Sequence, residues 1–389
     1  MDNFTFYAPT YFDFGRGAEL HTAELIQRFG GSRVLLHYGG GSIKKNGLYQ
    51  RIVSVLEEAG IFFVELGGVK PNPRSGLVYE GIRLCKKEKI DFILAVGGGS
   101  TIDSSKAIAA GALYPGDFMD FYRGKKTVEQ ALPVGTVLTI AAAGSEGSPN
   151  TVITEEETQI KKGMKSDLLR PVFSVLNPEL TCTLPPYQTA AGATDIMVHV
   201  CERYFSNTRE TEITDRLCEA VMKTIIHEAP RVIENPGNYE ARANIMWAGM
   251  LAHNNVCGVG REQDWASHHI EHELSARYDV THGAGLAVVT PKWMRYVLEK
   301  NPDKLVLFAV RVWDIPLDEN NPVETAKRGI EAFEAFLKKI GMPSSFEEIG
   351  AKQEDIPEMT DKLLGGKKTE GNYVRLERED VIRIYESCV

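Results

Sequence analysis

Short apolar runs that end in glycine, each followed by a helical pattern, recur through the first half of the chain. One run covers residues 33–38 and ends at Gly39-Gly-Gly-Ser42, and another covers residues 92–96 and ends at Gly97-Gly-Gly-Ser100. Apolar runs of about 4–8 residues that alternate with helices are typical of βαβ units. The sequence therefore predicts a mostly parallel sheet covered by helices. Further strands are expected at residues 61–66, 134–140, 151–154 and 172–176.

The pattern changes after Leu184-Pro-Pro186, where helical periodicity replaces the apolar runs. A chain of 389 residues has room for two domains of about 150 residues or more each. We therefore expect an α/β domain over residues 1–185 and an all-helical domain over residues 186–389. Helices of the second domain are expected near residues 188–206, 211–228, 238–256, 263–276, 285–299, 322–340 and 376–387.

The composition argues against several classes of function. The chain has 44 Lys and Arg against 53 Asp and Glu, a net charge of −9, and no basic tract. Nucleic acid or an anionic membrane is therefore not expected as a partner. No apolar run reaches the length of about 18 residues that a membrane-spanning helix needs. The six cysteines form no C-x-x-C pair, so we expect reduced thiols in a cytoplasmic protein and no structural zinc site built from them.

Glycines at the end of a buried strand predict a phosphate site. Gly97, Gly98, Gly99 and Ser100 precede an Ala-rich helix. Glycines let the backbone N–H groups approach a pyrophosphate closely, and the helix N-terminus favours its negative charge. The alternative interpretation is a tight turn between strand and helix. The segment is not G-x-G-x-x-G, so the ordinary dinucleotide fingerprint is absent.

A second glycine loop bears on the choice of cofactor. Gly39, Gly40, Gly41 and Ser42 contain no acidic residue, and Lys44-Lys45 follows. An acidic residue at such a strand end binds the ribose 2′-hydroxyl of NAD(H). Its absence leaves room for a 2′-phosphate and the lysines offer donors, so the loop favours NADP(H) over NAD(H). A glycine turn with two solvated lysines is the other interpretation.

The histidines are unevenly distributed, because seven of the nine fall between His199 and His282. Asp195 and His199 are four residues apart on an expected helix, and His268 and His272 are spaced in the same way on another, so each pair shares a face. Carboxylate and imidazole ligands suit Zn²⁺ or Fe²⁺. There is no H-E-x-x-H, which argues against a metalloprotease. For any single histidine, the alternative is an ordinary hydrogen-bonded residue; we take this interpretation for His21, His37, His227, His253 and His269.

These segments together resemble the iron-containing (group III) alcohol dehydrogenases, in particular the branch of butanol dehydrogenases and NADPH-dependent aldehyde reductases. The resemblance covers nearly the whole chain. It lies in Phe4 to Gly17, Tyr38-Gly-Gly-Gly-Ser-Ile-Lys-Lys-Asn-Gly47, Gly68-Val-Lys-Pro-Asn-Pro73, Gly97-Gly-Gly-Ser-Thr-Ile-Asp103, Gly144-Ser-Glu146, Asp195-x-x-x-His199, Asp264-Trp-Ala-Ser-His268 and His282-Gly.

The resemblance implies a fold like that of dehydroquinate synthase, with a dinucleotide-binding α/β domain, a helical metal-binding domain, and the active site in the cleft between them. It implies one divalent metal, Fe²⁺ or Zn²⁺. Spacing alone favours His272 as a ligand beside His268, whereas the family pattern makes His272 a polar neighbour on a proton path. The metal ligands that the resemblance implies are Asp195, His199, His268 and His282.

The cofactor contacts implied by the resemblance extend beyond the two glycine loops, to Asp103, Thr139, Lys161, Leu180 and Thr183. The chain departs from the commoner family pattern at Ala142-Ala143, Ser148 and Asn177-Pro178. These departures affect the expected contacts to ribose and nicotinamide and leave the metal ligands unchanged.

The resulting expectation is reversible hydride transfer between NAD(P) and a primary alcohol such as butanol, or the matching aldehyde. One carboxylate against a divalent ion leaves a net positive site, which favours an alkoxide. Two alternatives remain at this point: a zinc-dependent lyase resembling dehydroquinate synthase, and a metal- or nucleotide-binding protein without turnover. The family suggests a homodimer. The ligand set accepts Fe²⁺, Zn²⁺, Mn²⁺ or Co²⁺.

Overall fold

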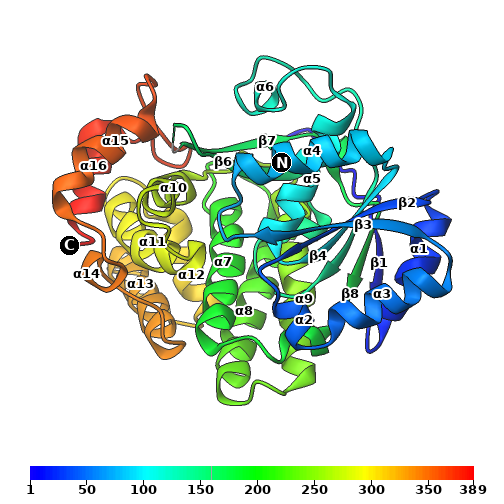
Figure 1. The fold of residues 1–389 in the computed structure, drawn as a ribbon. Coiled ribbons are helices and arrows are strands. Elements are labelled where there is room, and N and C mark those ends of the chain that lie inside the picture. Colours follow the sequence, from blue (N-terminus) through cyan, green and yellow to red (C-terminus); the bar gives the residue numbers. More distant parts are fainter. Residues whose placement is uncertain (159) are drawn as a thin grey trace. The chain divides into compact units, whose positions relative to one another are not determined.

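A computed structural model describes residues 1–158 and 160–389 (Figure 1). The chain forms two compact units. The α/β unit comprises Tyr7–Leu184 together with Gly237–Met250. The helical unit comprises Met1–Phe6, Pro185–Pro236 and Leu251–Val389.

Six parallel strands form the sheet of the α/β unit, in the order β1-β8-β5-β4-β2-β3. Tyr38 of β2 lies beside Val96 of β4, and Val96 lies beside Val137 of β5, so these three neighbouring strands end at the same edge. Residues 151–154, expected as a strand, lie in a separate antiparallel hairpin of β6 and β7. The strands are β1 (Tyr11–Phe14), β2 (Arg33–Gly39), β3 (Phe62–Val69), β4 (Phe92–Gly97), β5 (Val134–Leu138), β6 (Asn150–Glu155), β7 (Ile160–Lys165) and β8 (Phe173–Leu176).

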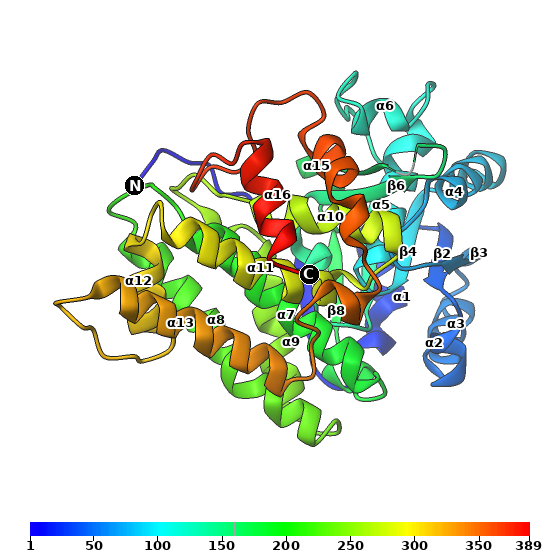
Figure 2. The same ribbon diagram turned by 90° about the vertical axis from the view of Figure 1, so that its left-hand side faces the viewer.

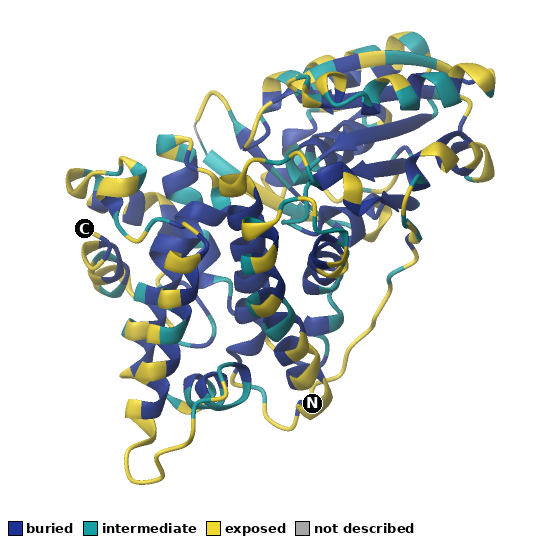
Figure 3. Ribbon diagram, turned by 90° about the horizontal axis from the view of Figure 1, so that it is seen from below, coloured by how far each residue is buried: buried dark blue, intermediate teal, exposed yellow. Residues whose placement is uncertain are grey.

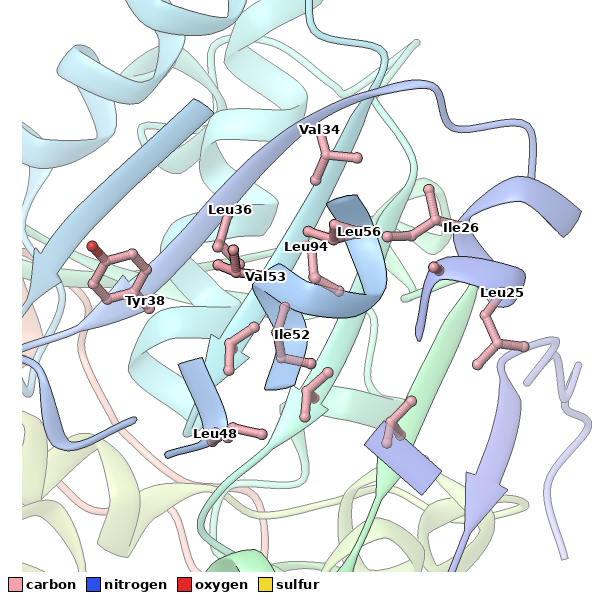
Figure 4. Packing of buried hydrophobic residues seen from close by; sticks show 14 of the residues in the cluster. Leu25, Ile26, Val34, Leu36, Tyr38, Leu48, Ile52, Val53, Leu56 and Leu94 are labelled. Carbon is pink, nitrogen blue, oxygen red and sulfur yellow. The ribbon is translucent and has the colours of Figure 1, made fainter. Parts of the chain in front are cut away.

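Alternation along the strands builds a core on each face of this sheet. On one face, Val34 and Leu36 pack with Ile52 in the cluster of Figure 4. On the other face, Leu35 packs with Ile108. The helices of this unit are η1 (Ala18–His21), α1 (Thr22–Arg28), α2 (Ser42–Lys45), α3 (Leu48–Glu58), α4 (Ser75–Glu88), α5 (Gly99–Leu113), α6 (Met119–Tyr122), η2 (Ser145–Gly147), η3 (Asp167–Leu169) and η4 (Pro178–Thr181).

The helical unit is built around α7 (Pro186–Tyr204), which is buried from Thr189 to Tyr204. Several of its other helices, such as α13 (Pro322–Lys339), carry buried residues on one side and exposed residues on the other (Figure 3). Those of the C-terminal part can be followed in Figure 2. They are α8 (Glu212–Glu234), η5 (Val256–Gly258), α10 (Ala266–Tyr278), α11 (His282–Leu298), α12 (Asp303–Val312), α13 (Pro322–Lys339), α14 (Phe346–Ile349), η6 (Gln353–Asp355), α15 (Ile356–Leu364) and α16 (Arg378–Glu386).

Two short segments belong to a different unit from their neighbours in the sequence. In α9 (Tyr239–His253), Met246 joins a cluster of the α/β unit, and Trp247 packs edge-on against Phe12 and Phe14. At the N-terminus, the backbone N–H of Asp2 donates to a carbonyl of the helical unit. The compact units are divided between Leu184 and Pro185 and exchange these two segments, and the expected domains over residues 1–185 and 186–389 stay a prediction.

Among the described residues, no helix is both long enough and apolar enough to span a membrane.

Candidate functional site

Three imidazoles of the helical unit converge on one carboxylate oxygen, that of Asp195. The Nε2 atoms of His199, His268 and His282 lie 3.7, 3.9 and 3.7 Å from Asp195 Oδ1. These distances are too long for hydrogen bonds. Ligands that each lie about 2.1 Å from a tetrahedral ion are separated by about 3.4 Å, close to the spacing observed. We call Asp195, His199, His268 and His282 the donor cluster.

The local fold brings these side chains together from three helices. Asp195 and His199 lie one turn apart on α7, His268 lies in the first turn of α10, and His282 begins α11. A Cβ on Gly283 would lie 1.9 Å from the backbone oxygen of Ala191, so only glycine allows α11 to approach α7 this closely. The glycine after His282 therefore explains how this histidine reaches Asp195.

Unpaired polar atoms indicate that the donor cluster suits a cation. Asp195 Oδ1 and His268 Nε2 are buried and have no hydrogen-bond partner. Buried polar atoms are normally satisfied, and an oxygen and a nitrogen lone pair that face one another are satisfied by a metal ion between them. The ligand atoms of Asp195, His268 and His282 all lie within 4.8 Å of one another, and His199 borders this group. The residues present therefore fit one divalent ion.

The His199 ring is held by stacking between two other imidazoles. Its centroid lies 4.2 Å from that of His253 and 4.7 Å from that of His268, with interplanar angles of 19° and 9°. Burial and the neighbouring cationic groups hold the pKa of His199 well below its usual range, so the ring is in the neutral form that binds metals. Arg203 contacts the His253 Nδ1 atom at 2.9 Å. No local sequence pattern distinguishes His253, since its contact with His199 depends on tertiary structure.

The remaining histidines of the window lie outside the donor cluster. The His272 ring is half-buried, and its centroid is 5.5 Å from that of His282. His272 also belongs to a second group of potential ligands, with Glu271 and His282. His269 pairs with Glu370 at 2.7 Å, and His227 lies on α8 with its side chain 70% exposed. His272 is therefore next to the donor cluster, without entering the group around Asp195.

Two buried glutamates contact the Nδ1 atoms of two imidazoles in the donor cluster. Glu202 lies 2.9 Å from His268 Nδ1, and Glu271 pairs with His282 Nδ1. Sequence reasoning missed both. A signal exists for Glu202, which lies three residues after His199 and therefore on the same face of α7.

In the α/β unit, the two glycine loops lie at the ends of adjacent parallel strands. Tyr38 and Val96 are partners, so Gly39 to Ser42 follows β2 where Gly97 to Ser100 follows β4 and enters α5. The Thr139 N–H, directly after β5, donates to the Gly97 oxygen at 3.0 Å. Ligands of open α/β sheets bind at such carboxyl ends. A Cβ would meet open space at Gly40 and Gly41, whereas at Gly97 it would lie 2.4 Å from Thr101.

The other expected cofactor residues take varied positions. Both Asp103 carboxylate oxygens accept bonds within the protein, from Ser145 Oγ at 2.6 Å and Val152 N at 2.9 Å. Burial raises the pKa of Asp103, and nearby Lys106 opposes that shift. Lys161 lies on β7, where its Nζ donates to Asn72 at 3.1 Å. Leu180 is buried in η4, and Thr183 is exposed just after it.

Comparison with known proteins identifies the family. Residues 9–178 match iron-containing alcohol dehydrogenase, and residues 189–389 match the C-terminal part of the same family. The chain belongs to the iron-containing alcohol dehydrogenases. It is 44% identical, over all of both chains, to probable NADH-dependent butanol dehydrogenase 2 of Bacillus subtilis (strain 168). It is 37% identical to the NADPH-dependent aldehyde reductase YqhD of Escherichia coli (strain K12), over 93% of each chain.

A solved structure extends this similarity to the whole iron-containing alcohol dehydrogenase fold. The crystal structure of NADH-dependent butanol dehydrogenase A from Thermotoga maritima superposes with a TM-score of 0.96, at 44% identity, over 100% of this chain and 99% of that one. The predicted family and fold class are confirmed. Membership implies an alcohol oxidoreductase that uses NAD(P) and a divalent metal. These matches favour neither the lyase nor the non-catalytic alternative.

Proposed function

We propose that this chain catalyses reversible hydride transfer between NAD(P) and a primary alcohol such as butanol, or the matching aldehyde. The names of its relatives, butanol dehydrogenases and an aldehyde reductase, support this substrate class. The observation that carries the proposal is the donor cluster, in which three imidazole Nε2 atoms lie within 3.7–3.9 Å of one buried carboxylate oxygen.

The donor cluster is proposed to hold one divalent ion, Fe²⁺ or Zn²⁺, through Asp195, His199, His268 and His282. When bound, such an ion supplies a Lewis acid for the substrate oxygen. Asp195 acts as a ligand and is therefore not free to act as a base. His272 lies beside the cluster and is proposed to pass the alcohol proton toward solvent.

The two glycine loops are proposed to bind the cofactor pyrophosphate and the adenosine ribose. The loop Gly39 to Ser42 carries no carboxylate, and Lys44 is 49% exposed next to it, which supports NADP(H) over NAD(H). Glu65 lies 3.8 Å from Lys44 and accepts bonds from Tyr38 and Tyr49, so it partly neutralises that lysine. The names of close relatives point toward NADH, and kcat/KM for the two cofactors decides between them. A homodimer in the cytoplasm is the assembly and location that we propose.

Oxidation of NADPH and NADH by butanal tests the proposed function. The protein is stripped with a chelator and assayed with and without added Fe²⁺ or Zn²⁺. We expect butanal-dependent oxidation that needs the added metal. No oxidation with either metal and either cofactor would refute the dehydrogenase assignment.

Matched variants test the proposed ligands. His268→Ala is expected to lose bound metal and activity, whereas His227→Ala, which changes an exposed histidine of α8, is expected to keep both. Asp195→Ala is expected to behave like His268→Ala. If Asp195→Ala keeps bound metal and full activity, the ligand assignment is wrong.

A further inference from the structure

We propose that two buried glutamates, Glu202 and Glu271, are positioning residues for the metal-facing imidazoles. Each glutamate fixes which ring nitrogen of its histidine carries the proton, and therefore which nitrogen is left to bind the ion. This inference rests on the proposed function, because it requires that these imidazoles bind a metal.

Glu202 is 1% exposed and accepts four hydrogen bonds. Its Oε1 accepts from Ser267 Oγ at 2.7 Å, from the His268 backbone N–H at 2.9 Å and from His268 Nδ1 at 2.9 Å. Its Oε2 accepts from the Trp265 N–H at 2.8 Å. A carboxylate with all these donors is fixed in place and keeps its acceptor face toward the imidazole.

The contact with Glu202 decides the tautomer of His268. A carboxylate opposite Nδ1 requires a proton there, because two acceptors would otherwise face each other. In the neutral ring, Nε2 is then a bare lone pair. That atom is buried, has no hydrogen-bond partner and lies 3.9 Å from Asp195 Oδ1. The nitrogen left unprotonated is thus the one that faces the other donors.

Glu271 has the same relation to His282. It is completely buried, accepts from Ser275 Oγ and pairs with His282 Nδ1. A Cβ on Gly285 would lie 2.6 Å from Glu271 Oε1, so this glycine leaves the space that the carboxylate occupies. The His282 Nε2 atom again points to Asp195 Oδ1, at 3.7 Å.

Glu202 also links the helices that carry the ligands. It lies on α7, on the face that holds Asp195 and His199, and it accepts N–H groups at the start of α10. A negative charge is stabilised at a helix N-terminus. One side chain therefore fixes both the His268 ring and the position of the helix that presents it.

His199 provides a contrast within the same cluster. Its Nδ1 atom has no hydrogen-bond partner, and its ring is held by stacking between two imidazoles. A carboxylate in contact with Nδ1 is therefore a feature of His268 and His282 that His199 lacks.

Metal affinity of the folded apoprotein tests the inference. Glu202→Gln and Glu271→Gln keep the side-chain shape and remove the charge. Glu219→Gln is the matched control, because Glu219 is also buried and hydrogen-bonded in the helical unit but bonds to Tyr204, Arg216 and Arg311 and to no imidazole. Each protein is stripped of metal, its Tm is recorded, and Co²⁺ is titrated against a competing chelator while the visible spectrum is followed.

We expect the two test variants to bind Co²⁺ about 10–100-fold more weakly than the wild type, with the control within about twofold. Equal affinity of wild type and both test variants would overturn the inference, and so would an equal loss in the control. The ¹⁵N shifts of histidine in the metal-free wild type give a readout that needs no variant. We expect a proton on Nδ1 of His268 and His282, and a ring with a proton on Nε2 and none on Nδ1 would overturn the inference.

Failure of the proposed function would have a different signature. Asp195→Ala that binds Co²⁺ as tightly as the wild type would refute the ligand assignment itself. Loss of Co²⁺ from Asp195→Ala, combined with unchanged affinity in both glutamine variants, would refute only the roles of Glu202 and Glu271.

Discussion

Replacement of Lys106 by methionine is expected to destabilise the α/β unit by about 4 kcal/mol. The Lys106 side chain is fully buried. Its Nζ donates to Ser145 O, Ser145 Oγ, Ser148 O and Asn150 O at 2.7–2.9 Å. Burial lowers the pKa of Lys106 to about 8, so the ammonium is still mostly protonated at pH 7. One charge thereby holds the segment that follows Gly144, next to Asp103.

The size of the expected loss of stability follows from the buried acceptors that methionine leaves without a donor. It has a similar length but no donor, so the loss is mainly polar. Breaking a buried charged interaction costs about 3–5 kcal/mol, and each stranded buried acceptor about 1–3 kcal/mol. These costs are not additive, because the four oxygens share one donor and one segment. At about 2–4 °C per kcal/mol for a unit of this size, Tm is expected to fall by about 8–16 °C.

Calorimetry at one scan rate measures the change, with Lys86→Met as the matched control. Lys86 is exposed and donates one hydrogen bond, to the Tyr114 oxygen at 3.0 Å. Exposed substitutions of this kind cost at most about 0.5 kcal/mol, so Tm is expected to change by less than about 2 °C. A Lys106→Met protein whose Tm lies within about 2 °C of the wild-type Tm would refute the reasoning.

Three further outcomes are expected. Gly283→Ala places a Cβ 1.9 Å from the Ala191 oxygen, so we expect a loss of about 1–3 kcal/mol and weaker metal binding, whereas Gly40→Ala, which meets open space, leaves Tm unchanged. Burial lowers the pKa of His37 from 6.5 to about 4. Below pH 6.5 the unfolded state therefore binds a proton that the folded state does not, so the stability of the protein falls as the pH falls. Urea unfolding at pH 6.5 and 5 is expected to show about 2 kcal/mol more loss in wild type than in His37→Gln. Lys44→Ala is expected to lower kcat/KM for NADPH about tenfold with little change for NADH, if Lys44 bonds the 2′-phosphate.

Two of the strands that the sequence predicts most directly are buried on both faces. Residues 33–38 and 92–96 are continuous apolar runs, and both lie inside the parallel sheet as β2 and β4. The edge strand β1 is only partly buried, and β7 contains Ile-Lys-Lys-Gly-Met-Lys, so neither has an apolar run to mark it. The partner of β1 is β8, far along the chain, so no local pattern encodes this pairing, whereas β7 pairs with the neighbouring β6.

Helical spacing predicted only some of the residues that lie together in the candidate site. Helical spacing alone pairs His268 with His272, because it sees one helix at a time. The structure instead places His282, from the next helix, beside Asp195 and His268. The family resemblance supplied that residue from the sequence, since it carries information about tertiary structure that spacing lacks.

The structure adds charged groups to the candidate site that the ligand set alone does not include. Asp195 alone against a divalent ion predicts a net positive site, but Glu202 and Glu271 add two buried carboxylates behind the imidazoles, and the buried Arg203 adds one positive charge. The net charge of these groups with a divalent ion is therefore close to zero. Each glutamate contacts the Nδ1 atom of its imidazole, whereas the Nε2 atom of that ring faces Asp195. Two unit charges about 6 Å apart in an effective dielectric constant of about 20 interact by about 3 kcal/mol. The two glutamates would therefore weaken the attraction of a bound ion for an anionic substrate oxygen. What a bound divalent ion would supply is Lewis-acid polarisation of the substrate oxygen, because the net charge of these groups would no longer favour an anion.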